Sequence, residues 1–256
     1  MIPCESVAEG AAASSFSLDF TDDAALCFIT RLITHMSAHV SVSGASAPYV
    51  KPLQDTMMRD PSCASYFTLS TVEHGPRGVT PRARTVVFEG FAVDIDDRFA
   101  LSCKLSSNSN KFAKRASDEV EICWWFSSAR VQFRFRGPMR FETSAQSGSR
   151  NALWEQLVLG DRAQFFYPPD MLAKDRQDAV YERATKALIE SRGAVPESFC
   201  VGLLVPLEVD VLDLNDSSRK YWRRTSVDDT AWEDFSGLAP PVLSVDAIIA
   251  ASTKES

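Results

Sequence analysis

The sequence lacks most of the patterns that mark common catalytic and nucleotide-binding sites. Three histidines occur in 256 residues, and no serine or cysteine stands in a recognisable nucleophile motif, so a hydrolytic triad is not supported. The P-loop pattern G-x-x-x-x-G-K-[ST] and the dinucleotide pattern G-x-G-x-x-G are both absent, which argues against nucleotide binding by either route. The six cysteines show no C-x-x-C spacing, and we expect them to be buried, reduced thiols.

Membrane, nucleic-acid and metal binding are also poorly supported. No apolar run reaches 18 residues and no signal peptide is recognisable, so we expect no membrane partner and a cytoplasmic location, with an organelle lumen or matrix as the open alternative. The formal charge of −7 argues against broad contact with nucleic acid. His35 and His39 have the spacing of two helical metal ligands, but no third ligand is near, so no metal site is predicted. An anion site would therefore be a local basic cluster.

Composition and periodicity divide the chain into four segments. The first is rich in Ala, Ser and Gly and is expected to be disordered. Apolar residues then follow helical spacing over 22–39 and again over 50–58, which predicts a helical extension. A main domain and a frayed C-terminal tail follow. The expected segments are the N-terminus, the helical extension, the main domain and the tail at residues 1–20, 21–61, 62–241 and 242–256.

From residue 66 onward the pattern is that of a β-protein. Aromatic and β-branched residues alternate with polar ones in short runs separated by turn residues, including a loop at 73–78 and an interruption at Gly137-Pro138. The expected strands are residues 66–72, 84–91, 99–103, 120–126, 131–136, 139–143, 199–205, 209–214 and 219–225. Helices are expected over 108–116, 150–159 and 175–191. This close spacing indicates a mainly β fold with peripheral helices (α+β), built on an antiparallel barrel or sandwich.

Three polar patterns could bind an anion, and each also has a simpler explanation. Arg84 heads an apolar strand, where its guanidinium could hold a phosphate or protect a sheet edge. Ser109-Asn110-Lys111 opens a short helix and suits a phosphate monoester, although an N-cap with a surface lysine is the commoner explanation of such a motif. Gln132, Arg134 and Arg136 share one face of a strand, as they would on an ordinary solvated sheet.

Together, the order and spacing of these patterns resemble the pyridoxamine 5′-phosphate oxidase superfamily of FMN-binding split barrels. Arg84-Thr85-Val86-Val87-Phe88 resembles the arginine-led FMN strand of that family. Ser109-Asn110-Lys111 resembles its Ser-Arg-Lys phosphate loop, with Asn110 in place of Arg. Gln132 resembles the glutamine that faces the flavin, and residues 219–223 resemble the terminal R-x-x-x-R element. The resemblance extends over residues 66–240.

The resemblance implies a homodimer of antiparallel split β-barrels with FMN at the subunit interface. It implies that Arg84, Ser109 and Lys111 hold the phosphate, and that Gln132 and Arg223 contact the ring region. The implied cofactor-binding residues are Arg84, Thr85, Val86, Val87, Leu105, Ser109, Asn110, Lys111, Gln132 and Arg223. Because a flavin carries the redox chemistry itself, neither a catalytic side chain nor a metal is expected.

The positions that bind the vitamin B6 substrate in this family are mostly altered. Where the family has a lysine for the substrate phosphate, this chain has Glu89, which would repel that phosphate. The family's Arg and His pair reads Arg219 and Tyr221, and Asp213 replaces a tryptophan six residues before that arginine. Arg162 is the one plausible cation where the family completes its phosphate pocket. The resemblance therefore implies a retained cofactor site and a largely lost B6 substrate site.

Three functions are compatible with these patterns. The favoured one is an FMN-dependent oxidoreductase of unknown substrate, which reduces a small molecule with a nicotinamide donor. The second is a pyridoxamine/pyridoxine 5′-phosphate oxidase, against which Glu89 and Tyr221 argue. The third is a non-catalytic protein that binds flavin or a partner protein, so whether the chain is an enzyme stays an open question at the level of sequence.

Overall fold

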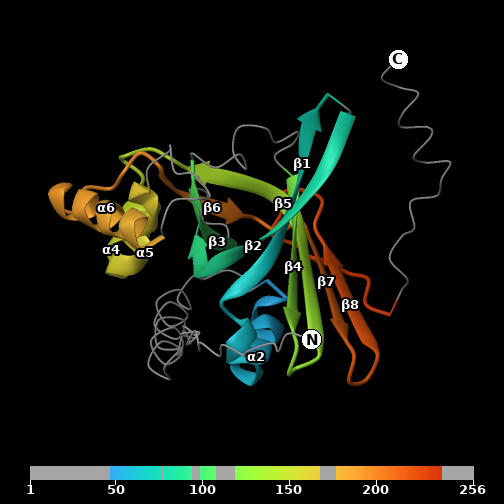
Figure 1. Ribbon diagram of the computed structural model, residues 1–256. Coiled ribbons are helices and arrows are strands. Elements are labelled where there is room, and N and C mark those ends of the chain that lie inside the picture. The colour runs from blue at the N-terminus through green and yellow to red at the C-terminus, as the bar shows by residue number, and fades with distance from the viewer. Residues whose placement is uncertain (1–46, 77, 94–98, 108–118, 168–176, 238–256) are drawn as a thin grey trace, which may run out of the picture.

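The structure is a computed structural model that describes residues 47–76, 78–93, 99–107, 119–167 and 177–237 (Figure 1). The expectations for the N-terminal segment, the helices over 22–39 and 108–116, and the C-terminal tail lie outside these residues. Within the described part of the chain, no helix has the length and apolar character needed to cross a bilayer. The same residues contain no cluster of His, Cys, Asp and Glu that could hold a metal ion.

Six antiparallel strands form a closed barrel (Figure 1). Their order is β4-β1-β2-β3-β6-β5, and β5 pairs back onto β4 to close it. They are β1 (Tyr66–Gly75), β2 (Gly78–Val93), β3 (Phe99–Ser106), β4 (Glu119–Phe126), β5 (Val131–Glu142) and β6 (Phe199–Leu204). The sheet continues from β5 through β7 (Glu208–Asp213), β8 (Ser218–Arg223) and β9 (Glu233–Asp234). The expected mainly β fold built on an antiparallel barrel is confirmed.

The β1–β2 hairpin is longer than the sequence predicts. Instead of a loop at 73–78, β1 continues to Gly75 and β2 begins at Gly78. Gly78 has φ +93°, which glycine adopts without a steric penalty, so the chain can reverse within a short hairpin turn. Arg84 is therefore in the interior of a long strand and not at its head.

Strand β5 belongs both to the barrel and to the extension of the sheet. Its residues 131–136 pair with β7, whereas residues 139–142 pair with β6. The expected interruption at Gly137-Pro138 does not occur, because the Pro138 carbonyl accepts a 3.1 Å hydrogen bond from the Val205 amide and the strand stays paired. A Cβ atom on Gly137 would lie 2.3 Å from the Val205 carbonyl oxygen. Only glycine lets the two backbones approach this closely.

Aromatic side chains from alternating strand positions fill the barrel. Trp124 is fully buried, and its ring centre lies 4.7 Å from that of Phe88. Its indole nitrogen donates a 2.8 Å hydrogen bond to the carbonyl of Cys63, the last residue of the short helix η1 (Pro61–Cys63). Helix α2 (Val50–Arg59) adds Leu53 to the same core, as the apolar spacing over 50–58 predicted.

A second core attaches the remaining helices to β6. These helices are α4 (Gly148–Gln156), α5 (Leu159–Ala163), η2 (Gln164–Phe166) and α6 (Gln177–Glu190). Trp154 of α4 contacts Phe199 of β6, with ring centres 5.0 Å apart, and Leu188 of α6 joins the same cluster. In Figure 1 these helices lie on the opposite side of the barrel from β7 and β8.

The four described cysteines are free thiols. Cys103 and Cys200 are buried as expected, and burial raises the pKa of Cys200 to about 12. Cys63 and Cys123 are only partly buried, so the expectation of complete burial is wrong for these two. Cys123 is exposed to this extent because it stands on the outward side of β4, next to the polar face of β5.

Candidate functional site

Arg84 is a partly buried cation with an unused hydrogen-bond donor. It lies opposite Leu69 in the β1–β2 ladder, and its Nη2 donates to Thr71 Oγ1. Its Nη1 is buried and has no hydrogen-bond partner among the described residues. Burial and the charge of Arg82 lower the pKa of Arg84, against the opposing charge of Glu73, yet a guanidinium stays protonated at neutral pH. Because a buried donor without a partner costs free energy, this position suits an oxygen of an anion.

The other residues predicted on β2 and β3 divide between surface and core. Thr85 is exposed and Val87 is half-buried, whereas Val86 packs in the barrel core. Leu105 of β3 is also in the core and is only 4% exposed. Thr85 and Val87 are therefore the positions of this group whose side chains reach the surface. The predicted phosphate-loop residues Ser109, Asn110 and Lys111 lie outside the described residues.

The outward side of β5, β7 and β8 carries what we call the charged face. Its members are Gln132, Arg134 and Arg136 on β5, Glu208 and Asp210 on β7, and Arg219, Tyr221 and Arg223 on β8. The alternating burial along β5 confirms the predicted separation of its polar and apolar side chains. Because β7 lies between the two arginine-bearing strands, each of its carboxylates has arginines on both sides.

Asp210 joins two arginines of the charged face. Its carboxylate accepts 2.7 Å hydrogen bonds from both Nε and Nη2 of Arg219, and a 3.0 Å hydrogen bond from Nε of Arg134. Burial by itself raises the pKa of Asp210, but the hydrogen bonds from Arg219 and Arg134 outweigh it and hold that pKa below its usual value. The carboxylate is therefore charged at neutral pH, and it engages both guanidinium groups.

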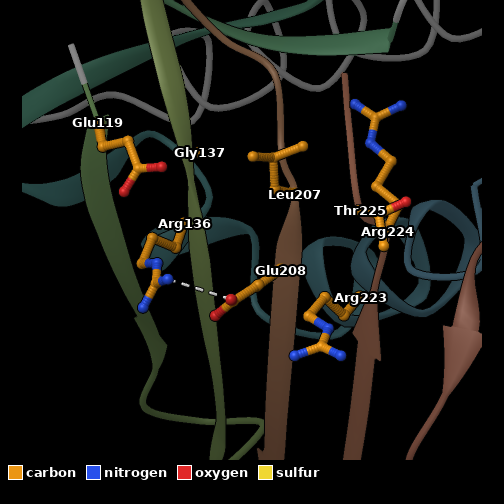
Figure 2. A pocket seen from close by; sticks show the side chains of 8 residues that line it. All are labelled: Glu119, Arg136, Gly137, Leu207, Glu208, Arg223, Arg224 and Thr225. Carbon is orange, nitrogen blue, oxygen red and sulfur yellow. Dashed lines mark ion pairs between the residues drawn. The ribbon is translucent and has the colours of Figure 1, made fainter. Parts of the chain in front are cut away.

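A pocket of about 260 Å³ opens on this side of the sheet (Figure 2). It is lined by Glu119, Arg136, Gly137, Leu207, Glu208, Arg223, Arg224 and Thr225. Figure 2 shows Arg136, Glu208 and Arg223 in a row across three strands, with Arg136 Nη2 3.1 Å from Glu208 Oε1. The Nε of Arg223 is buried and has no hydrogen-bond partner among the described residues. Arg223, one of the predicted ring contacts, therefore brings an unused donor to the pocket wall.

Gln132 lies on the charged face but does not line this pocket. Its Nε2 donates to Cys123 Sγ over 3.3 Å. Trp125 of β4 stands opposite Gln132 in the ladder and is 44% exposed. The predicted ring contacts Gln132 and Arg223 thus share one face of the sheet, about four residues apart along the strand direction.

Arg84 and the charged face belong to separate parts of the surface. Arg84 shares the core-facing side of the sheet with Leu69 and Phe135, whereas the charged face is on the outward side. From Arg84 on β2 to Arg223 on β8 there are five steps, through β1, β4, β5 and β7, or roughly 24 Å along the sheet at about 4.8 Å per step. Within one chain, Arg84 and Arg223 are therefore far apart along the sheet.

Glu89 forms a buried ion triplet with two residues that the sequence analysis did not single out. It stands where the register of β2 against β3 shifts, between Phe88 and Gly90. The Nζ of Lys104 lies 2.8 Å from Glu89 Oε1 and 2.8 Å from Asp161 Oδ2. Burial lowers the pKa of Lys104, but the charges of Glu89 and Asp161 outweigh it and raise that pKa above its usual value. The Lys104 ammonium therefore stays charged between its two carboxyl partners.

The remaining altered positions also have partners within the chain. The Nη2 of Arg162 donates a 2.7 Å hydrogen bond to the Glu155 carbonyl, and its guanidinium lies 5.5 Å from the centre of the Trp154 ring. Tyr221 is buried on the charged face, and Asp213 accepts a 2.9 Å hydrogen bond from the Asn215 amide. Arg162 of α5 therefore packs against α4.

A Glu89→Lys variant is expected to lower the free energy of unfolding by about 3–5 kcal/mol, because it sets a second ammonium against the buried Lys104. Urea denaturation measures the change. Glu197→Lys makes the same charge change at an exposed position and is expected to shift stability by about 0.5 kcal/mol or less. Equal midpoints for the two variants would show that the ion triplet does not stabilise the fold.

Comparison with known proteins agrees with this geometry. The family model for the pyridoxamine 5′-phosphate oxidase FMN-binding domain matches residues 46–143. The chain is 31% identical over 169 residues to pyridoxine/pyridoxamine 5′-phosphate oxidase 2 of Arabidopsis thaliana, a match that covers 63% of this chain and 79% of that protein.

Solved structures show the same fold. A pyridoxamine 5′-phosphate oxidase-related, FMN-binding protein of Nostoc punctiforme is 27% identical, with a TM-score of 0.63 over 77% of this chain and 100% of that one. PhzG of Burkholderia lata shares the fold at 18% identity, with a TM-score of 0.58 over 79% of this chain and 96% of that one. The unpartnered Nη1 of Arg84 fits the phosphate of FMN, because a buried cationic donor needs an anionic acceptor. The chain therefore belongs to the pyridoxamine 5′-phosphate oxidase family, and its cofactor is FMN.

Proposed function

We propose that this chain is an FMN-dependent oxidoreductase that works as a homodimer. The observation that supports this proposal is the buried Nη1 of Arg84, which lacks a partner among the described residues. The phosphate of FMN carries close to two negative charges and accepts several hydrogen bonds. FMN supplies the electron and hydride transfer when bound, and the protein supplies binding, orientation and electrostatics.

Different residues of the chain bind the phosphate and the ring of the cofactor. Arg84 binds the phosphate, and its hydrogen bond to Thr71 fixes the direction of the guanidinium. Ser109 and Lys111 add donors to the same phosphate. Gln132 and Arg223 contact the ring region, where the Nε of Arg223 has a free N–H to donate to an oxygen of the ring. Such charge-assisted hydrogen bonds contribute about 1.5–3 kcal/mol each.

The distance between the two groups of residues supports a dimer. Arg84 and Arg223 are five strand steps apart in one chain, on opposite sides of the sheet. A second copy, related by a two-fold axis, can bring its charged face to the Arg84 of the first copy, and the symmetry then makes two equal sites. FMN would lie at the interface between the two copies.

Anaerobic reduction tests the proposed activity. With FMN bound to the protein, addition of NADH or NADPH is expected to bleach the visible absorption band of the oxidised flavin, and air is expected to restore it. Free FMN at the same concentration is the control for the reaction without protein. If neither nucleotide bleaches the bound flavin faster than free FMN, the chain is a flavin-binding protein without this activity.

A second candidate activity is oxidation of pyridoxamine or pyridoxine 5′-phosphate, the reaction named for the Arabidopsis relative. The holoprotein incubated with pyridoxamine 5′-phosphate and oxygen would then form pyridoxal 5′-phosphate and hydrogen peroxide. The buried triplet of Glu89, Lys104 and Asp161 argues against this candidate, because its ammonium already has two carboxylate partners. If neither product forms, this candidate activity is excluded.

A further inference from the structure

Two exposed aromatic side chains, which we call the aromatic pair, are neighbours on the outward face of the barrel. Trp125 of β4 is 44% exposed and Tyr66 of β1 is 46% exposed. The register of β1 against β4, continued by two residues, sets Tyr66 beside Trp125. The same register sets Phe67 beside Trp124 on the core side, and these two rings have their centres 5.4 Å apart. The pairing of the two strands therefore extends as far as the aromatic pair.

Trp125 is the most exposed of the five tryptophans. Trp124 and Trp154 are at most 1% exposed, Trp222 is 6% exposed and Trp232 is half-buried. A large aromatic side chain gains free energy when it leaves water. A tryptophan that is left in water on a rigid sheet, next to an exposed tyrosine, therefore suits a flat, apolar ligand.

The aromatic pair lies between two of the predicted cofactor-binding residues. Tyr66 pairs with Val87 of β2, and Trp125 pairs with Gln132 of β5. One row across four neighbouring strands thus contains Val87, Tyr66, Trp125 and Gln132. This row spans three strand steps, or roughly 14 Å at about 4.8 Å per step. A flavin ring that contacts both ends of the row must lie over the two aromatic side chains between them.

The row changes from apolar to polar along its length. Val87 at one end is apolar, whereas Gln132 at the other end carries an amide, whose Nε2 donates to Cys123 Sγ. An isoalloxazine ring also has an apolar dimethylbenzene end and a polar end with carbonyl oxygens. Flat aromatic ligands stack favourably on tryptophan and tyrosine rings. The row therefore matches the flavin ring both in polarity and in aromatic character.

We propose that Tyr66 and Trp125 bind the flavin ring by stacking and position it against Gln132. This inference rests on the proposed function, because it uses the placement of the ring beside Gln132. The aromatic pair is on the same outward side of the sheet as the charged face. In the proposed dimer, both therefore come from the copy that brings its charged face to the Arg84 of the other.

Substitution of Trp125 tests the contact with the ring. Trp125→Ala is expected to weaken the binding of FMN, and of riboflavin, which has the same ring and no phosphate, by about tenfold each. Trp125→Tyr keeps an aromatic ring and is expected to stay within about threefold of the wild-type chain. Calorimetric titration of the full chain freed of its flavin measures both affinities. Wild-type affinity of Trp125→Ala for the two flavins would overturn the proposal.

Tyr66→Ala has a matched control in Tyr181→Ala. Tyr181 of α6 is 42% exposed, close to the exposure of Tyr66, but it belongs to the helices attached to β6. Tyr66→Ala is expected to weaken the binding of both flavins by about fivefold, and Tyr181→Ala is expected to change neither affinity. Equal losses in the two variants would overturn the role of Tyr66.

The fluorescence of bound FMN gives a second readout. An indole ring in van der Waals contact with a flavin quenches the flavin fluorescence. With protein in excess, FMN is expected to fluoresce weakly on the wild-type chain and more strongly on a chain with both Tyr66→Ala and Trp125→Ala. Equally weak fluorescence of bound FMN on both chains would overturn the proposal. If that double variant also sediments as a monomer, the aromatic pair belongs to the subunit interface instead.

The outcomes separate this inference from the proposed function. Binding and fluorescence are measured without a nicotinamide donor, so they give an answer whether or not the bound flavin is reduced. If neither nucleotide reduces the flavin but Trp125→Ala loses affinity for both flavins, the activity is excluded and the stacking contact is supported. If a nucleotide reduces the flavin and Trp125→Ala binds both flavins like the wild-type chain, only the inference is excluded.

Discussion

Replacement of Arg84 by alanine is expected to weaken FMN binding by at least about 2 kcal/mol, or roughly 30-fold in dissociation constant. The variant removes a partly buried, charged guanidinium whose Nη1 has no hydrogen-bond partner among the described residues. Quenching of FMN fluorescence on titration with the protein measures the affinity. An affinity equal to that of the wild-type chain would contradict the assignment of Arg84 to the phosphate.

Arg82→Ala is the matched control for this variant. Arg82 lies two residues away on the same face of β2, but it is exposed and its Nε is paired with Glu73 at 2.8 Å. Its removal changes the charge of the chain equally and is expected to alter FMN affinity less than threefold, since exposed ion pairs contribute about 1 kcal/mol or less. A similar loss in both variants would point to general electrostatic attraction and not to a specific contact.

The Arg84→Ala chain also permits a test of the proposed dimer. If Arg84 of one copy and Arg223 of the other serve the same FMN, a mixed dimer of Arg84→Ala and Arg223→Ala chains has one doubly damaged site and one intact site. Co-expression is then expected to restore about a quarter of the FMN sites, because about half of the dimers are mixed. No recovery beyond the two separate variants would show that both arginines serve their site from the same chain.

A large effect on stability is expected at Gly137. An added Cβ would lie 2.3 Å from the Val205 carbonyl oxygen and 3.0 Å from the Leu207 amide nitrogen, and both are backbone atoms. Backbone cannot rotate away as the end of a side chain can, so Gly137→Ala must push apart two chain segments. We expect a loss of about 3 kcal/mol or more in the free energy of unfolding, measured by urea denaturation with tryptophan fluorescence.

Gly148→Ala provides the control for this variant. Gly148 is the first residue of α4, and an added Cβ there would meet no heavy atom within 4 Å. Because alanine is the better helix former by about 1 kcal/mol at most, this substitution is expected to leave stability unchanged or slightly increased. If Gly137→Ala is as stable as Gly148→Ala, the backbone of Gly137 and that of residues 205–207 are farther apart than the structure shows.

Much of the barrel could be predicted because the information is local. Along β5 the alternation of apolar and polar residues indicates a strand with one buried face. The places where prediction was wrong depend on partners distant in the sequence. Pro138 was expected to interrupt a strand, but its carbonyl finds the Val205 amide, which no local pattern can indicate. The sequence does not predict that β2 begins at Gly78, because a short hairpin turn and an irregular loop have similar composition.

The ionic groups of the site show the same limit more clearly. The sequence presents Glu89 as a charge that would repel a ligand and gives no sign that Lys104 is its partner, whereas the structure pairs the two across β2 and β3. Asp210 pairs with Arg134, which is 76 residues away in the sequence, and Lys104 pairs with Asp161, which is 57 residues away. The sequence shows a charged residue in an alternating strand, but only the packing of strands shows which opposite charge it meets.

The separation of Arg84 from the charged face has a consequence for how chains of this kind diverge. In the arrangement proposed above, substitutions at Asp210 or Arg219 alter the groups presented beside the flavin, while the residues around Arg84 belong to a different hairpin. Mutations that are well separated and share no partner have nearly independent effects. Selection for a new ligand can therefore act on β7 and β8 while the cofactor is retained, so that one inherited flavin site can serve descendants with unrelated metabolic roles.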